Sequence, residues 1–366
     1  MALNQVGLER LNTDTTDKLG ERKNLIINGA MQVAQRGDTA SVTSGYGGAD
    51  RFKFDRSGAA VVTLKQGGSG VSPTNQGFGF SQHIDVTTAD SSLAAGDYAM
   101  LSYRFEGQDL QQLKKGTANA QQVTLSFHIK SPKTGTHIVE LVDQSNSGRH
   151  VNKAYTVSSA NTWEKKTVTF PMETSNAITN DNARRMDLNW WLAAGSTYSS
   201  GTLQTDWGAD TNANRAVGQV NCMDSTSNDI YITGVQLEVG TVATDFEHRS
   251  FAQELLLAQR YFISNSGGSD VYVFAAKGQG SSSCDVGIPV PVAMRAQPTV
   301  TCSINRFFRS TTTSFSSSST NPSIVQYQAN VSSFVLAVNV GGHSTTNNEA
   351  GAWTPNSSGL LLDAEL

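Results

Sequence analysis

The feature that most constrains this chain is a long series of short apolar or alternating runs, separated by turn-forming residues. The runs recur from residue 24 to residue 237 with no helical periodicity between them. Strands of that length without intervening helices are typical of antiparallel β-sandwiches, so the predicted fold class is all-β. Within segment 121–130 every second residue is apolar, so one face of that strand is expected to contact water. The predicted strands are 24–27, 51–54, 59–64, 98–105, 122–129, 137–142, 153–157, 165–170, 185–192 and 229–237.

The composition agrees with such a fold and excludes several classes of partner. Charged residues make up 16% of the 366 residues, the formal net charge is −4 and no basic run occurs. Because binding to a phosphate backbone requires a positive surface, nucleic acid is not expected as a partner. No uncharged apolar stretch approaches the roughly 20 residues that span a bilayer, so membrane insertion is not expected. The first 20 residues lack a cationic head followed by an apolar block, and no export signal is expected. Cys222, Cys284 and Cys302 are predicted to be free thiols.

One segment, 250–262, has a clear helical pattern. Ser250 with Gln253 predicts a capping box, and Phe251, Leu255, Ala258 and Phe262 form an apolar stripe. Beyond this helix only 9 of 104 residues are charged, against 49 of the preceding 262, which indicates a separate β-rich module. The predicted domains are an attachment segment (1–23), a jelly-roll β-sandwich (24–247), a linking helix (248–262) and a β-rich tip domain (263–366), itself expected to be a sandwich.

The N-terminal segment carries Leu3, Val6, Leu8 and Leu11 among polar residues. This spacing predicts a short amphipathic helix, which is too short to be stable alone and requires a partner. Copies of the same helix or another protein are the two candidates, and a frayed terminus is the alternative.

Motifs of enzyme chemistry are missing from the sequence. No complete dinucleotide-binding loop, nucleophile elbow, helical histidine pair or calcium loop occurs, so no catalytic residue, cofactor or metal site is predicted. Asp55, Glu106, Glu140 and Asp143 are expected to be solvated. The chain is therefore expected not to be an enzyme. A polysaccharide hydrolase or esterase stays open as an alternative, because paired carboxylates need only proximity in space.

Two segments resemble the two ends of a widespread phage tail-fibre module. The first is Asn24-Leu25-Ile26-Ile27-Asn28-Gly29-Ala30-Met31-Gln32-Val33, with Gln35-Arg36-Gly37 and Ala49-Asp50-Arg51-Phe52 after it. The second runs from Tyr231-Ile232-Thr233-Gly234-Val235-Gln236-Leu237-Glu238-Val239-Gly240 through Ala243-Thr244-Asp245-Phe246-Glu247-His248-Arg249 to Gln259-Arg260-Tyr261-Phe262. The resemblance covers about residues 24–262, and segment 289–300 is similar to runs in such fibre tips. It implies a jelly roll similar to carbohydrate-binding modules, carried on virion fibres that are usually homotrimeric.

The function expected from this resemblance is that of a non-enzymatic phage tail fibre. Such a protein is made in the host cytoplasm, forms a homotrimer and belongs to a tail appendage of the virion. Residues 1–23 are expected to attach it to the tail or another virion protein, and the tip to contact a host-surface glycan or protein. The alternative is a head fibre or a capsid decoration protein.

Two groups of residues are candidates for contacts with a host receptor. Trp190, Trp191 and Trp207 are candidate stacking platforms for a glycan, although alternation along a strand predicts that Trp190 and Trp191 face opposite ways and that one is core. In the tip, the candidates for a receptor-contact patch are Arg306, Phe307, Phe308 and Arg309 together with Trp353.

Overall fold

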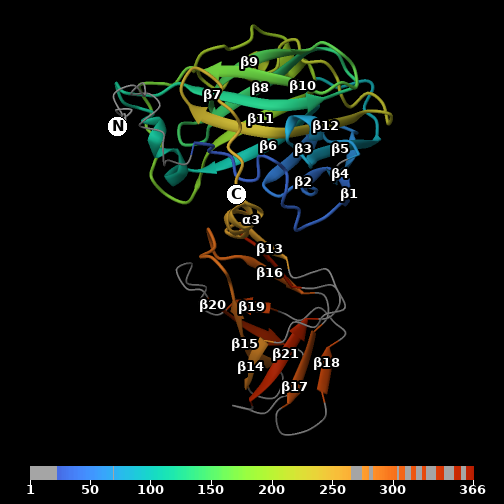
Figure 1. Ribbon diagram of the computed structural model, residues 1–366, viewed down its shortest axis with the longest axis vertical. Helices are drawn as coiled ribbons and strands as arrows, with labels where there is room; N and C mark the ends of the chain where they lie inside the picture. The colour runs from blue at the N-terminus through green and yellow to red at the C-terminus, as the bar shows by residue number, and fades with distance from the viewer. Residues whose placement is uncertain are drawn as a thin grey trace, which may run out of the picture.

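The computed structural model of the chain is dominated by a β-sandwich, with a second β-rich region below it (Figure 1). It describes residues 23–68, 70–264, 274–279, 283–302, 305–309, 315–318, 324–326, 335–341, 350–355 and 360–366. The helix predicted near the N-terminus lies outside these residues. The all-β fold class is confirmed. Among the described residues no helix is long and apolar enough to cross a bilayer.

The sandwich consists of two six-stranded sheets whose neighbouring strands are antiparallel. Sheet A contains, in spatial order, β1 (Thr39–Val42), β4 (Val61–Gly67), β5 (Ser81–Thr88), β12 (Asp229–Val239), β7 (Val123–Lys130) and β10 (Glu164–Phe170). Sheet B contains β2 (Ser44–Tyr46), β3 (Phe52–Ser57), β6 (Tyr98–Glu106), β11 (Arg184–Ala194), β8 (Gly135–Asp143) and β9 (Arg149–Val157). From β1 onward the chain crosses repeatedly between the sheets, so strands distant in sequence become neighbours.

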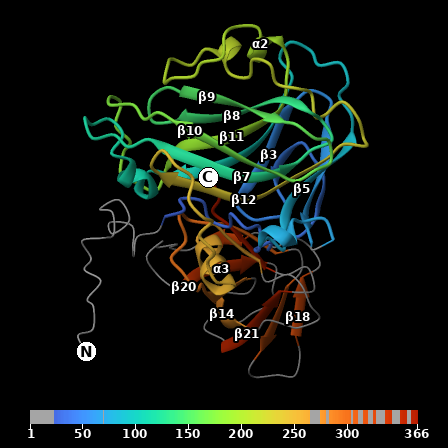
Figure 2. The same ribbon diagram turned by 45° about the horizontal axis from the view of Figure 1, so that its top comes forward.

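Short helical turns and one longer helix connect and flank these strands. They are η2 (Thr74–Gln76), η3 (Gly107–Leu113), α2 (Ser196–Ser199), η4 (Asn212–Asn214) and α3 (Phe251–Gln259). Figure 2 shows α2 above the sandwich and α3 below it.

The core lies between the two sheets and is rich in aromatic side chains. Trp190 of sheet B packs edge-on against Phe127 of sheet A, with ring centroids 5.7 Å apart, and its centroid lies 6.3 Å from that of Phe52. Cys222 is a buried free thiol near this core, as predicted. Contact between aromatic rings from both sheets fixes the sandwich spacing.

Most predicted strands are present, with boundaries shifted by a few residues. The prediction for residues 24–27 is wrong: this segment is buried but belongs to no strand. The strands β1, β2 and β5 were not predicted from the sequence. In β5 only Ile84 and Val86 carry the apolar alternation, which is too short a pattern to stand out.

The prediction that one face of β7 contacts water is also wrong. Thr124, Ser126 and His128 point away from the core, yet all three are buried. The loops next to β7 cover them: the Thr124 hydroxyl donates to the carbonyl of Gly240 at 2.8 Å, and the ring of Phe78 lies 5.1 Å from that of His128. The polar alternation therefore correctly identifies the outer face of β7, but it does not show that this face is exposed to solvent.

The predicted helix is present as α3, and its capping box at Ser250 is confirmed. The predicted apolar stripe is partly wrong. Phe251 is 55% exposed and Leu256 is 46% exposed, whereas Glu254 and Ala258 are buried. Phe262, the last residue of the predicted stripe, belongs to a strand beyond the helix. The orientation of α3 follows from Glu254, which faces the sandwich. Its carboxylate accepts a hydrogen bond from the backbone N–H of Asn28 at 2.6 Å.

The two segments that carry the sequence resemblance pack against each other. The N–H of Leu25 donates to the carbonyl of Leu237 at 2.9 Å, and the side-chain amide of Asn24 donates to the carbonyl of Val235 at 3.0 Å. A Cβ atom on Gly29 would lie 2.1 Å from the carbonyl oxygen of Val235, so only glycine fits there. We call this contact between segments 24–31 and 231–254 the interlock.

Below α3 lie two further sheets (Figure 1). A three-stranded sheet contains β13 (Phe262–Ser264), β22 (Leu360–Asp363) and β16 (Thr299–Cys302). A seven-stranded sheet contains β18 (Phe315–Ser318), β17 (Asn305–Arg309), β21 (Ala350–Pro355), β14 (Phe274–Gln279), β15 (Ser283–Pro289), β20 (Val335–Gly341) and β19 (Ile324–Gln326).

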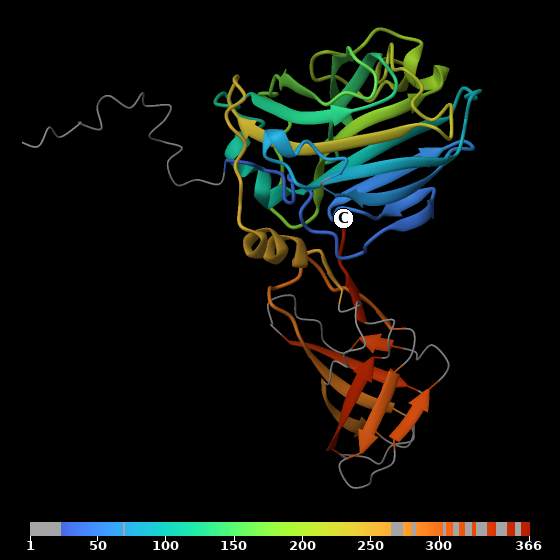
Figure 3. The same cartoon turned by 45° about the vertical axis from the view of Figure 1, so that its right-hand side comes forward.

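Residues 363–366 return from β22 to the sandwich, as the red end of the ribbon shows in Figure 3. There Glu365 forms an ion pair with Arg51, and the two side chains are 4% and 1% exposed. The Arg51 guanidinium also lies 3.3 Å from the ring centroid of Tyr261. At the edge of this contact, Arg36 pairs with Asp363, which is 45% exposed, at 3.1 Å. The buried pair thus ties the last residues of the chain to the base of sheet B.

We predict that Glu365→Gln lowers the free energy of unfolding by about 3 kcal/mol, because it leaves the buried Arg51 without its counter-charge. Urea denaturation of the full chain measures the change. Asp363→Asn is the matched control, and its loss is expected to stay below about 1 kcal/mol, since that pair is partly exposed. Equal losses in the two variants would contradict the assignment.

We also predict that acid weakens the sandwich through His128. Burial, with a smaller contribution from Lys165, lowers the pKa of His128 to about 4 from its ordinary value of 6.5. The unfolded chain therefore binds the proton first, so stability is complete above about pH 6.5 and falls as the pH drops towards 4. His128→Gln is expected to remove about 2–3 kcal/mol of this pH dependence, measured by urea denaturation at pH 7 and pH 4. An unchanged pH dependence in this variant would contradict the assignment.

Candidate functional site

Trp190 and Trp191 do face opposite sides of sheet B, but both are fully buried. Trp190 belongs to the main core. Trp191 lies on the outer face, where Tyr198 of α2 packs 5.4 Å from its ring and the Arg215 guanidinium lies 5.2 Å from it. Because the connection from β11 to β12 covers the outer ring as well, neither tryptophan is accessible as a glycan platform. The prediction of a glycan platform at Trp190 and Trp191 is therefore wrong.

Trp207 is the half-buried member of the predicted group. Its indole N–H donates to the carbonyl of Pro171 at 2.9 Å, and the ammonium of Lys115 lies 5.0 Å from its ring centroid. Trp207 lies in the loop between α2 and η4, and these contacts hold it apart from Trp190 and Trp191. The three tryptophans therefore do not form a common surface.

The predicted tip residues lie on two neighbouring strands. Arg306, Phe307, Phe308 and Arg309 belong to β17, Trp353 belongs to β21, and the backbone register places Phe307 opposite Trp353. The structure thus brings these segments side by side. Their side chains lie outside its described part.

Three of the four carboxylates that were expected to be solvated are instead fully buried and paired with cations. Glu106 pairs with Arg260 at 2.7 Å, and Glu140 pairs with Arg215 at 2.6 Å. Although burial opposes its charge, the Glu140 carboxylate raises the pKa of Arg215 above its ordinary value. Asp143, the third buried carboxylate, accepts from the ammonium of Lys115 at 2.5 Å. These groups act as structural ion pairs, and Asp55 is the fourth, half-buried carboxylate.

Lys115 is the centre of a buried polar cluster at one end of the sandwich. Its ammonium contacts Asp143, Glu173 at 3.2 Å and the carbonyl of Asn176 at 2.7 Å. Although burial raises the pKa of Glu173, hydrogen bonds from Arg149 and Lys115 hold it below its ordinary value. The cluster joins the loop after η3, the end of β8 and the loop after β10.

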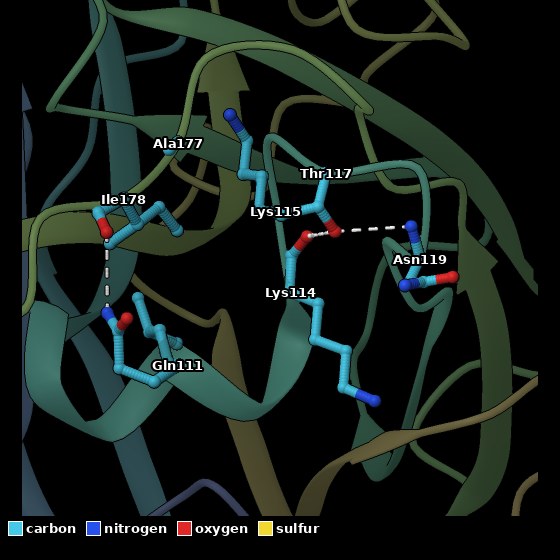
Figure 4. Close-up of a pocket in the computed structure, with 8 residues that line it drawn as sticks. Gln111, Lys114, Lys115, Thr117, Asn119, Ala177 and Ile178 are labelled. Carbon is cyan, nitrogen blue, oxygen red and sulfur yellow. Dashed lines mark hydrogen bonds between the residues drawn. The ribbon is translucent and has the colours of Figure 1, made fainter.

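A pocket of about 400 Å³ opens beside this cluster. Figure 4 shows Lys115 and Lys114 extending in opposite directions from adjacent positions, and a hydrogen bond from Gln111 to the carbonyl of Ile178. The polar lining of the pocket comes mostly from η3 and the loop that follows. The apolar lining includes residues from the loop after β10. The lining residues are Leu110, Gln111, Lys114, Lys115, Thr117, Asn119, Ala177 and Ile178.

No pattern in the sequence indicates this pocket. Its two walls are about 60 residues apart, and they meet where Ala177 touches Gly116, at which an added Cβ would lie 2.4 Å from the Ala177 backbone. Adjacent lysines before a glycine are too common a pattern to identify a site. The described residues contain no group of three His, Cys, Asp or Glu side chains that could hold a metal ion.

Comparisons with known proteins give similarity in structure only. No protein-family model matches the chain, and no curated protein matches it in sequence. A tailspike protein 4 domain of bacteriophage CBA120 aligns with 59% of this chain at 15% identity and a TM-score of 0.32; the chain spans only 21% of that protein. A putative sugar-binding protein from Bacteroides thetaiotaomicron aligns over 60% of this chain and 100% of its own length, with 14% identity and a TM-score of 0.32. A family 11 carbohydrate-binding module of a Clostridium thermocellum cellulase aligns over 57% and 98%, with 12% identity and a TM-score of 0.29.

We predict that the two neighbouring lysines of this region differ sharply in their contribution to stability. Lys115→Met leaves the fully buried Asp143 without its cation and is expected to lower the free energy of unfolding by about 3–5 kcal/mol. Lys114→Met is the control, and because that side chain is exposed, the expected change is within about 0.5 kcal/mol. Urea denaturation of both variants measures the difference, and a large loss in the Lys114 variant would contradict it.

Proposed function

We propose that the chain is a non-catalytic structural protein of a phage virion, a homotrimeric tail fibre that recognises a glycan on the host surface. The observation that carries the proposal is the interlock. The segments that resemble the opening and the close of the tail-fibre module meet in space and hydrogen-bond to each other, as the two ends of one folded module would.

Self-association is supported by two exposed apolar residues of α3. Phe251 and Leu256 are each about half exposed, while Glu254 of the same helix is buried and bonded to Asn28. Contact between copies of the chain would remove both side chains from water. Burying a large apolar side chain contributes about 1.5–3 kcal/mol relative to leaving it exposed.

A non-catalytic role is supported by the paired state of three buried carboxylates. Glu106, Glu140 and Asp143 each have a cationic partner within 2.8 Å, so none is held as a free acid or base. The assay is release of reducing sugar or acetate from host envelope material. Release by the purified chain would favour a hydrolase or an esterase instead.

The mass of the chain in solution tests the trimer. We expect about three times 39.1 kDa at micromolar concentration by light scattering, and a lower mass for the double variant Phe251→Ser, Leu256→Ser. The control is Val242→Ser, which changes an exposed apolar residue outside the helix and should leave the mass unchanged. A parent mass near that of one chain would refute the trimer.

Immunogold labelling of intact particles tests the location. Antibody against residues 263–366 is expected to label the distal end of tail appendages. Label spread over the capsid would show that the chain is a head fibre or a decoration protein instead of a tail fibre. Absence of label from purified particles would refute the virion role.

A further inference from the structure

The pocket beside Lys115 contains polar groups that the fold does not use. Among the described residues, Lys114 makes hydrogen bonds only through its backbone, donating to Gln111 and accepting from Thr117. Asn119 likewise uses its backbone N–H and carbonyl. An ammonium group and a side-chain amide are therefore left available at the pocket wall.

The apolar part of the lining comes from both segments. Leu110 of η3 and Ile178 of the loop after β10 are buried, and Ala177 is exposed at the pocket surface. The volume of about 400 Å³ lies within the range of about 300–1,000 Å³ typical of pockets for small ligands. Aliphatic groups facing amide and hydroxyl groups match a ligand with one apolar face and several hydroxyls.

The walls are held in place before any ligand arrives. Lys115 is anchored by three acceptors beneath the pocket, and Gly116 has a φ of +83° against the backbone of Ala177. The Gln111 amide is fixed by its bond to the carbonyl of Gly107 at 2.9 Å, which leaves its side-chain oxygen as an acceptor. A preformed site avoids the entropic cost of ordering loops on binding.

The charge at the pocket is unbalanced. The ammonium of Lys115 is compensated by Asp143 and Glu173, whereas Lys114 has no carboxylate partner among the described residues. An anionic group next to Lys114 would gain a charge-assisted hydrogen bond.

We propose that this pocket binds an anionic saccharide unit, one that carries a carboxylate or a phosphate. The Lys114 ammonium pairs with the anionic group, Asn119 and Gln111 bond to ring hydroxyls, and Ala177 with Ile178 contacts the apolar face of the ring. The choice of a saccharide among anionic ligands rests on the proposed glycan recognition. Several copies on one particle would raise the avidity of a weak single site.

Calorimetric titration of the full chain with three sugars tests this assignment. The probes are methyl glucuronide, glucose 1-phosphate and neutral methyl glucoside. We expect at least one anionic sugar to bind at least tenfold more tightly than methyl glucoside, and comparison of the first two probes distinguishes carboxylate from phosphate. Lys114→Gln should weaken anionic binding at least tenfold, and Asn119→Ala should weaken binding of every sugar that binds.

The matched control is Lys165→Gln, which removes another exposed lysine at a distant position on β10. It should bind like the parent. Failure of both anionic sugars to bind, equal binding of the neutral sugar, or equal loss in the Lys114 and Lys165 variants would overturn the inference. These outcomes are independent of particle labelling: a tail protein that binds none of the sugars refutes the pocket alone, and a sugar-binding chain absent from particles refutes the virion role alone.

Discussion

The sandwich depends on how a buried segment without a strand partner satisfies its backbone. Leu25, Ile26 and Ile27 are buried, and an unpaired buried N–H or carbonyl costs about 1–3 kcal/mol. Side chains supply part of what a neighbouring strand would give. Asn24 accepts from the N–H of Ile26 at 2.9 Å, the Tyr103 hydroxyl accepts from the N–H of Ile27 at 2.9 Å, and Arg249 donates to the carbonyl of Ile26 at 3.1 Å.

This constraint explains the composition of the segments that resemble the tail-fibre module. Asn24 bonds the segment to β12, Asn28 adopts a φ of +61° and bonds through its side chain to Val33 and Asp50, and Gly29 makes room for the backbone of Val235. Glu254 then carries the contact into α3. The buried ion pair of Arg51 and Glu365 connects the base of the sandwich to residues 363–366. The connection between the two β regions thus depends on polar contacts that side chains of specific shape provide.

How far the sequence predicts this structure depends on the range of the interactions. Strands such as β6 and β11 follow from local apolar alternation, and the capping box at Ser250 follows from two residues three apart. Segment 24–27 has the composition of a strand but bonds through side chains, which no local pattern reveals. The burial of Trp191 depends on Tyr198 and on the more distant Arg215, and the pocket beside Lys115 depends on a loop about 60 residues away, so neither follows from a local pattern.

The division between scaffold and recognition follows from the same physics. A segment that must satisfy buried backbone groups admits few residue types, so it retains a recognisable pattern, and that pattern reports the fold. A loop pocket such as the one lined by Lys114 and Asn119 places its free groups in solvent, where substitution costs little stability. Specificity for a surface ligand can therefore change at those positions while the interlock stays fixed. For a protein of this architecture, the residues that identify the module and the residues that select a ligand are expected to be different ones.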